Sequence, residues 1–155
     1  MSRTRVSGSL TLVTGDEVKS VDTTITVAQM LALFATPRTL VPAPGVGYAL
    51  AFVGAVFFYD YGAAAYAGIA AGEDLAIKYT DASGLEVSEV ETTGFLDQTS
   101  DQLRYARPHQ AASGVNSITP VPNAPLVLHL LVGEIITGDG PLKVRTYYRR
   151  IPAVL

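Results

Sequence analysis

The chain has 155 residues, of which 48% are hydrophobic and 16% are charged, and its formal net charge is −3. This length supports one core without a metal or a disulfide, and the lack of cysteine excludes thiol catalysis, cysteine-ligated metal sites and disulfide scaffolds. The charged fraction is below the roughly 25% typical of soluble domains, so we expect contacts between subunits to cover apolar surface.

The N-terminal region predicts a flexible arm, residues 1–8, in front of a single domain, residues 9–155. Arg3 and Arg5 carry the charge of the arm. Polar residues follow them in place of an apolar segment, so we expect no secretory signal. The product is expected to stay in the compartment where it is made.

The first third of the domain predicts short strands and one short helix. The helix is expected within residues 27–34, because Thr26 can cap its start and Pro37 lies just past its end. It has at most two turns. The expected strands are residues 9–13, 18–26 and 38–41, with a turn at 14–16 between the first two.

Residues 46–72 are the most apolar stretch, and they raise the question of a membrane span. The strongly apolar part, residues 48–58, is too short for a spanning helix, which needs roughly 20 residues. We interpret it as a strand with bulky side chains on one face, Leu50, Phe52, Val56 and Phe58, and mostly small apolar ones on the other. Both faces are expected to be covered, by a second sheet or by a neighbouring subunit.

Alternating residues predict two hairpins in the rest of the chain. Residues 75–80 and 85–88 alternate around a turn at 81–84. Residues 126–132 and 142–148 alternate around a turn at 137–141, and we predict a second hairpin there. Its outward face carries long side chains that suit water or a partner: Lys143, Arg145, Tyr147 and Arg149.

Turn residues recur at short intervals along the whole domain, which is typical of all-β proteins. The predicted fold is a single-domain antiparallel β-sandwich, with a jelly roll favoured. Residues 106–125 are rich in Pro, Ser, Asn and Ala, and they predict a long loop that can be functional or become ordered against a partner.

Charge is distributed unevenly along the sequence. Residues 1–59 have a net charge of +1, residues 60–101 of −8 and residues 102–155 of +4, which sum to −3. Solvated strand faces explain this pattern, and so does an acidic section that meets the basic section of a neighbouring subunit. The basic cluster at the C-terminal end lacks the pattern of any nucleic-acid-binding fold, so direct nucleic-acid binding is not expected.

The sequence contains no motif for catalysis, a cofactor or a metal. His109 and His129 share no metal-binding spacing, and we expect His129 to be packed or at an interface. Two carboxylate pairs, Glu89 with Glu91 and Asp97 with Asp101, are interpreted as solvated acids. A small hydrolase that uses Asp97 and Asp101 stays open as an alternative.

The candidate interface residues combine the arm, the apolar strand, the aromatic residues that follow it, the long loop and the basic strand. They are Arg3, Arg5, Phe52, Phe57, Tyr59, Tyr61, Tyr66, His109, Arg145 and Arg149.

Three parts of the sequence resemble small proteins of tailed bacteriophages. They are residues 35–45, residues 63–80 and residues 123–149, and Gly94-Phe95-Leu96-Asp97 with Asp101 also fits the resemblance. Such proteins are encoded near the capsid genes. The resemblance implies a head decoration, or cement, protein, and it brings no catalytic residues with it.

The resemblance and the residue patterns together predict a structural virion protein on the capsid exterior. It would self-associate, with a trimer favoured, and stabilise the head by bridging subunits of the major capsid protein. The alternative is a phage receptor-binding or glycan-binding module, in which Tyr59, Tyr61 and Tyr66 contact a sugar.

Overall fold

The computed structural model describes residues 17–108 and 119–153. In chain order the elements are β1 (Lys19–Ile25), α1 (Val27–Met30), β2 (Arg38–Val41), β3 (Tyr48–Tyr59), β4 (Leu75–Tyr79), β5 (Glu86–Val90), β6 (Gln102–Ala106), β7 (Leu126–Leu130) and β8 (Leu142–Pro152). The predicted arm, residues 1–8, and the predicted strand at 9–13 lie outside the described residues, and so do residues 109–118, half of the predicted loop.

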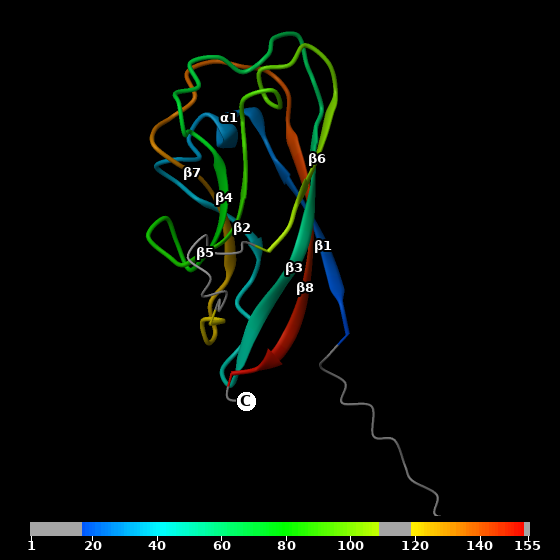
Figure 1. The fold of residues 1–155 in the computed structure, drawn as a ribbon, viewed down its shortest axis with the longest axis vertical. Helices are drawn as coiled ribbons and strands as arrows, with labels where there is room; N and C mark the ends of the chain where they lie inside the picture. Colours follow the sequence, from blue (N-terminus) through cyan, green and yellow to red (C-terminus); the bar gives the residue numbers. More distant parts are fainter. Residues whose placement is uncertain (1–16, 109–118, 154–155) are drawn as a thin grey trace, which may run out of the picture.

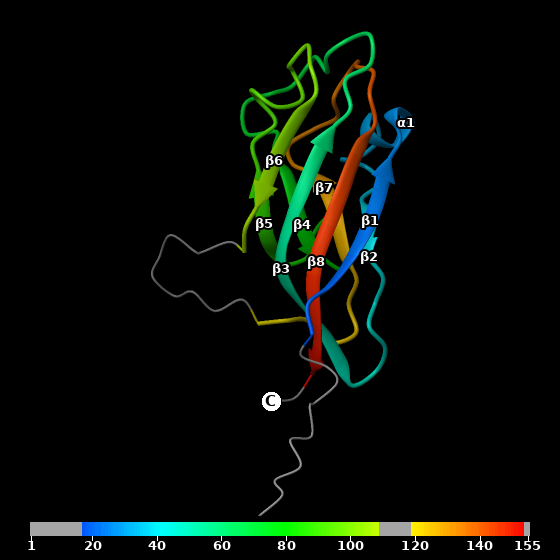
Figure 2. The same cartoon turned by 90° about the vertical axis from the view of Figure 1, so that its right-hand side faces the viewer.

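The strands form two antiparallel four-stranded sheets that face each other (Figures 1 and 2). Sheet A has the order β1-β8-β3-β6, and sheet B has the order β2-β7-β4-β5. This confirms the predicted β-sandwich. Consecutive strands lie in different sheets at every step except the β4–β5 hairpin. This order favours the jelly roll, which stays a prediction.

The core lies between the two sheets and is built from the alternate residues of each strand. Leu126, Leu128 and Leu130 of β7 are fully buried, and Leu142 and Val144 of β8 face them from sheet A. Phe95 and Leu96, from the segment between β5 and β6, belong to the same cluster. A core of this size supplies the apolar burial that holds the sandwich together.

Helix α1 has a well-defined N-terminal cap but is only four residues long. The side chain of Thr26 accepts a hydrogen bond from the backbone N–H of Gln29, whose own side chain accepts from the backbone N–H of Thr26. This reciprocal capping box satisfies backbone donors that have no partner within the helix. The helix is confirmed within the predicted range, as a single turn.

Strand β3 contains a bulge that the sequence interpretation missed. Its register with β8 shifts between Phe52 and Gly54, so the inward-facing positions change from even to odd residue numbers. Phe57 and Tyr59 are therefore fully buried, and Phe58 is only half-buried. The prediction that Phe58 shares one face with Leu50 is wrong, because an uninterrupted alternation cannot continue through the bulge.

The predicted hairpin of residues 75–88 is confirmed as the antiparallel pair β4–β5. The second predicted hairpin is wrong, because β7 pairs with β2 and β4 of sheet B while β8 pairs with β1 and β3 of sheet A. Residues 131–141 connect the sheets instead of reversing the chain within one. Val132, expected on the buried face, is 62% exposed.

Two buried tyrosines predict a loss of stability at alkaline pH. Burial raises the pKa of Tyr79 from 10.0 to about 12 and also raises the pKa of Tyr66, and each hydroxyl donates to a backbone carbonyl, of Leu50 and Gly140 respectively. Because the folded state holds the proton more tightly, this stability is fully present below pH 10 and is lost as the pH rises toward 12.

We expect the free energy of unfolding, measured with denaturant at several values above pH 9, to fall with pH less steeply in a Tyr79→Phe variant than in the native protein. The variant keeps the ring but cannot ionise. An unchanged slope in the variant would contradict the role assigned to Tyr79.

Candidate interaction surface

The face of sheet A that points away from the core is the most distinctive surface of the described residues. Neighbouring strands place its outward side chains in two rows. The first row is Asp22, Arg145, Val56 and Tyr105, and the second is Thr24, Lys143, Phe58 and Leu103. Each row runs in the order β1, β8, β3, β6, so one half of the face is polar and the other half is apolar.

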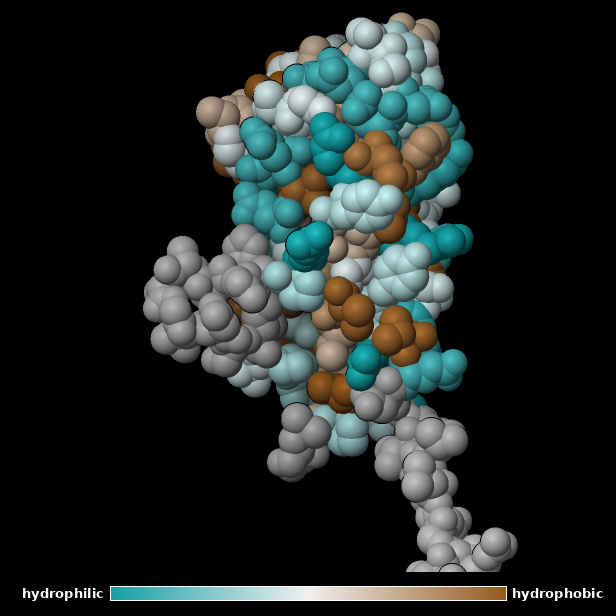
Figure 3. All heavy atoms as spheres, turned by 45° about the vertical axis from the view of Figure 1, so that its right-hand side comes forward, coloured by the Kyte–Doolittle hydropathy of each residue, from teal (hydrophilic) through white to brown (hydrophobic). Residues whose placement is uncertain are grey.

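The apolar half consists of Val56, Phe58, Leu103 and Tyr105, and we call it the apolar strip. Its two β6 residues are the most exposed, Tyr105 at 70% and Leu103 at 44%. Figure 3 shows hydrophobic and hydrophilic residues interspersed over this side of the molecule. Exposed apolar residues gathered in this way are a feature of contact surfaces more than of water-facing strands.

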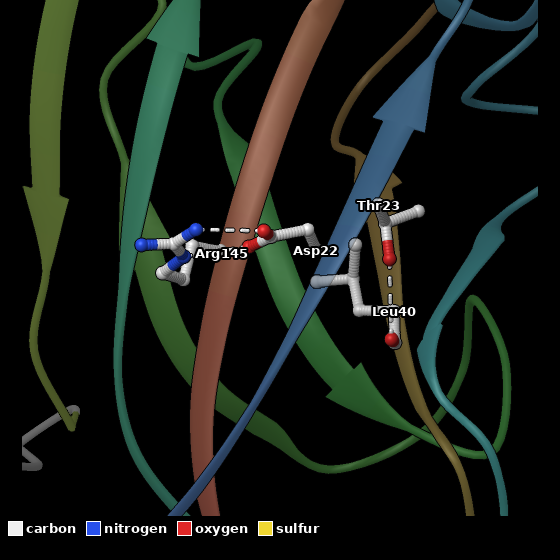
Figure 4. A network of polar contacts seen from close by, with 4 residues as sticks. All are labelled: Asp22, Thr23, Leu40 and Arg145. Atoms are coloured by element: carbon white, nitrogen blue, oxygen red, sulfur yellow. Dashed lines mark hydrogen bonds and ion pairs between the residues drawn. The ribbon is translucent and has the colours of Figure 1, made fainter.

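The charges on the polar half are paired with each other. The guanidinium of Arg145 on β8 donates two hydrogen bonds to the carboxylate of Asp22 on β1, at 2.6 and 2.7 Å (Figure 4). These bonds hold the pKa of the Asp22 carboxyl below its ordinary value. The ammonium of Lys143 lies 2.7 Å from a carboxylate oxygen of Asp60 and 5.5 Å from the ring centroid of Phe58.

The two rows line a shallow groove of about 710 Å³. Strand β1 is held along one side of this groove, since the hydroxyl of Thr23 donates to the backbone carbonyl of Leu40 on β2 at 3.3 Å (Figure 4). That bond joins the two sheets at the edge of the sandwich. The groove therefore lies on a rigid sheet, and its charges are already neutralised in pairs, which lowers the cost of removing them from water.

Three of the predicted interface residues belong to the core and not to a surface. Phe57 and Tyr59 are 0% exposed and Tyr66 is 2% exposed, so these three interface predictions are wrong. The hydroxyl of Tyr59 donates to the backbone of Asp139, and the ring of Tyr66 lies 5.7 Å from that of Tyr59. The bulge in β3 is the physical reason for the first two, because it turns odd-numbered residues inward.

The remaining predicted interface residues are spread over the molecule. Phe52 and Tyr61 are partly buried against the core. Arg145 lies on the groove, and Arg149 lies outward on the same strand, opposite Ala51 of β3. Arg3, Arg5 and His109 lie outside the described residues.

The predicted outward face of β8 matches the structure, since Lys143 and Arg145 are exposed and alternate with buried Leu142 and Val144. The sequence interpretation missed the partners of that face on other strands. Alternation within residues 102–106 is the signal that could have found Leu103 and Tyr105.

Three titratable groups outside this face, His129, Asp97 and Asp101, have structural partners. His129 is 6% exposed, its ring Nε2 lies 3.1 Å from the backbone oxygen of Phe34, and burial lowers its pKa. This agrees with the expected packed histidine. Asp101 accepts a hydrogen bond from the backbone N–H of Tyr61, and Asp97 accepts one from the side chain of Gln98.

Within residues 17–108 and 119–153, no group of three or more His, Cys, Asp or Glu side chains is arranged to hold a metal ion. The same part of the chain contains no helix with the length and apolar character needed to cross a membrane.

The fold and its outward face define a β-sandwich with one exposed, half-apolar sheet surface. A solved structure described as the capsid of Ralstonia phage GP4 is similar to this chain, with a TM-score of 0.47 and 13% sequence identity over 87% of this chain and 85% of that chain. No protein-family model and no curated protein matches the sequence.

Proposed function

We propose that this protein is a structural component of a tailed-phage virion, a decoration protein that binds the major capsid protein on the capsid exterior and self-associates, with a trimer favoured. The observation that carries the proposal is the exposed apolar strip beside paired charges on sheet A. The resemblance of residues 35–45, 63–80 and 123–149 to small tailed-phage proteins supports the same conclusion.

The physical argument concerns what such a face can do. A stable protein contact buries apolar residues, aromatic ones above all, at its centre and tolerates charges that already have partners. The apolar strip offers an aromatic side chain that is 70% exposed, Tyr105, on a strand of a rigid sheet. A cement protein needs a compact body with a contact surface of this kind and no reaction centre.

The glycan-binding alternative loses most of the residues on which it was based. Tyr59 and Tyr66 are buried, so a sugar cannot stack on them, and the hydroxyl of Tyr61 already donates to the backbone oxygen of Ala63. The decoration role is therefore the better supported of the two.

The first test asks whether the apolar strip mediates assembly. We expect the native protein to be an oligomer by light scattering and to bind expanded capsids that lack it, and we expect Tyr105→Glu to abolish at least one of these contacts. The change places a charge within the apolar strip, at a side chain that is 70% exposed and does not belong to the core.

The matched control is Val46→Glu, which adds the same charge at a position that is 88% exposed and lies in the turn before β3. It should leave both assembly and capsid binding unchanged. A native protein that is monomeric and does not bind capsids would overturn the proposed function, and saturable glycan binding without capsid affinity would favour the alternative.

A further inference from the structure

Strand β6 is an open edge of sheet A. Among the described strands it lies at the end of the strand order and pairs only with β3, while β1 forms the opposite edge (Figure 2). Among the described residues, no backbone group outside β3 forms a backbone hydrogen bond with Gln102–Ala106. An open edge presents unpaired N–H and C=O groups to any strand that can align with it.

The apolar strip continues up to that open edge. Leu103 and Tyr105 are the last members of the two rows, and they lie two residues apart along β6. A strand added beside β6 would place its own alternate side chains at cross-strand distances of about 4.5–5.5 Å from these two. Apolar residues two positions apart on the added strand would extend both rows.

The chain contains such a segment before its first described residue, Glu17. Residues 9–13 are Ser-Leu-Thr-Leu-Val, in which Leu10 and Leu12 alternate with Ser9 and Thr11. The segment has five residues, the same length as β6. We propose that residues 9–13 of a second copy of this chain add to the open edge of β6, with Leu10 and Leu12 beside Leu103 and Tyr105.

The donor must be a second copy because the chain is too short to reach its own β6. In the order β1-β8-β3-β6, a strand added beyond β6 lies four strand spacings from β1. At about 4.8 Å per spacing, the straight-line distance is about 19 Å, and that line passes through the sheet itself. From Val13 to Lys19, the first residue of β1, six residue steps span at most about 22 Å when fully extended. A path around the sheet is longer than that.

This exchange is heterologous, since the donated segment and the accepting edge are different surfaces. Such contacts close into a ring when the rotation between copies allows it, which is compatible with the favoured trimer. The inference rests on the self-association in the proposed function, and it names the two surfaces that would make the contact.

Engineered disulfides test the contact directly, because the chain has no cysteine of its own. A Leu12→Cys chain is mixed, under oxidation, with a Leu103→Cys chain and separately with a Tyr105→Cys chain. We expect an intermolecular disulfide in one of the two mixtures, identified by mass spectrometry. We expect none with Val46→Cys, which is 88% exposed and lies before the start of β3, while β6 pairs with the other end of that strand, Ala55–Tyr59. No disulfide in either mixture would overturn the proposal.

A pair of double variants separates this contact from self-association in general. Leu10→Asp with Leu12→Asp should shift the mass in solution from oligomer to monomer, and so should deletion of residues 1–16. Ser9→Asp with Thr11→Asp adds the same charge to the opposite face of the segment and should retain the oligomer.

An oligomer that survives the deletion would overturn the exchange and leave the proposed function standing. A native chain that is monomeric at every concentration would overturn both. Thermal unfolding of each variant shows whether the described fold is intact.

Discussion

Replacement of Phe57 by alanine is expected to lower the free energy of unfolding by about 3–5 kcal/mol, the cost of removing a large aromatic side chain from a packed core. The side chain is 0% exposed and lies in the cluster between the two sheets. Denaturant unfolding of the purified variant measures the change.

The adjacent residue provides the control. Phe58 is half-buried on the outward face, so Phe58→Ala should cost about 1–2 kcal/mol. The two variants remove the same group from neighbouring positions of β3, and the register shift between Phe52 and Gly54 decides which of the two positions faces the core. A larger loss at Phe58 than at Phe57 would refute the bulge.

A second large effect is expected at Gly84, in the turn between β4 and β5. A Cβ atom there would overlap the backbone carbonyl oxygen of Tyr79, the last residue of β4. A backbone atom of a strand cannot move aside as the end of a flexible side chain can. Gly84→Ala should therefore force the hairpin open and cost more than about 3 kcal/mol, as measured by thermal or denaturant unfolding.

Gly47 distinguishes this overlap from the general cost of replacing glycine. Its φ is +83°, and nothing lies within 4 Å of the position that a Cβ would take. Gly47→Ala should cost only about 1 kcal/mol, for the backbone conformation alone. If the two variants lost equal stability, steric overlap at Gly84 would not be the cause.

Local elements of this fold follow from short-range sequence signals. Strand β2 coincides with the predicted residues 38–41, and α1 begins at Val27, directly after the predicted cap. Each of these signals acts over a few residues: the cap at Thr26, the alternation in 75–79 and the turn at 81–84. The local sequence is therefore enough to predict the helix start, the strand and the hairpin.

Pairing between distant strands was not predictable in the same way. Residues 126–130 and 142–148 have the same alternation, and that pattern fits two strands of one hairpin as well as two strands in opposite sheets. Gly54 was the available hint of the bulge, because glycine inside a strand pattern often marks one. The alternation on either side of it concealed the shift.

The contact surface was predictable only in part. The outward face of β8 follows from its own alternation. The apolar strip comes from β3 and β6, whose paired residues Phe58 and Leu103 are 45 positions apart in the sequence. No pattern within one segment shows that they are neighbours. Alternation alone therefore predicts an interface for the aromatic residues near residue 60, whereas the core contains most of them.

The position of β8 between β1 and β3 has a consequence for the order of events during synthesis. Sheet A needs its last strand in the middle, so β1 and β3 cannot be joined until residues 142–152 have been made. Residues 60–141 separate β3 from β8, and at roughly 5–20 residues per second their synthesis takes about 4–16 s. The rows that form the contact surface are complete only after that delay, so a growing chain does not present the surface through which finished copies would assemble.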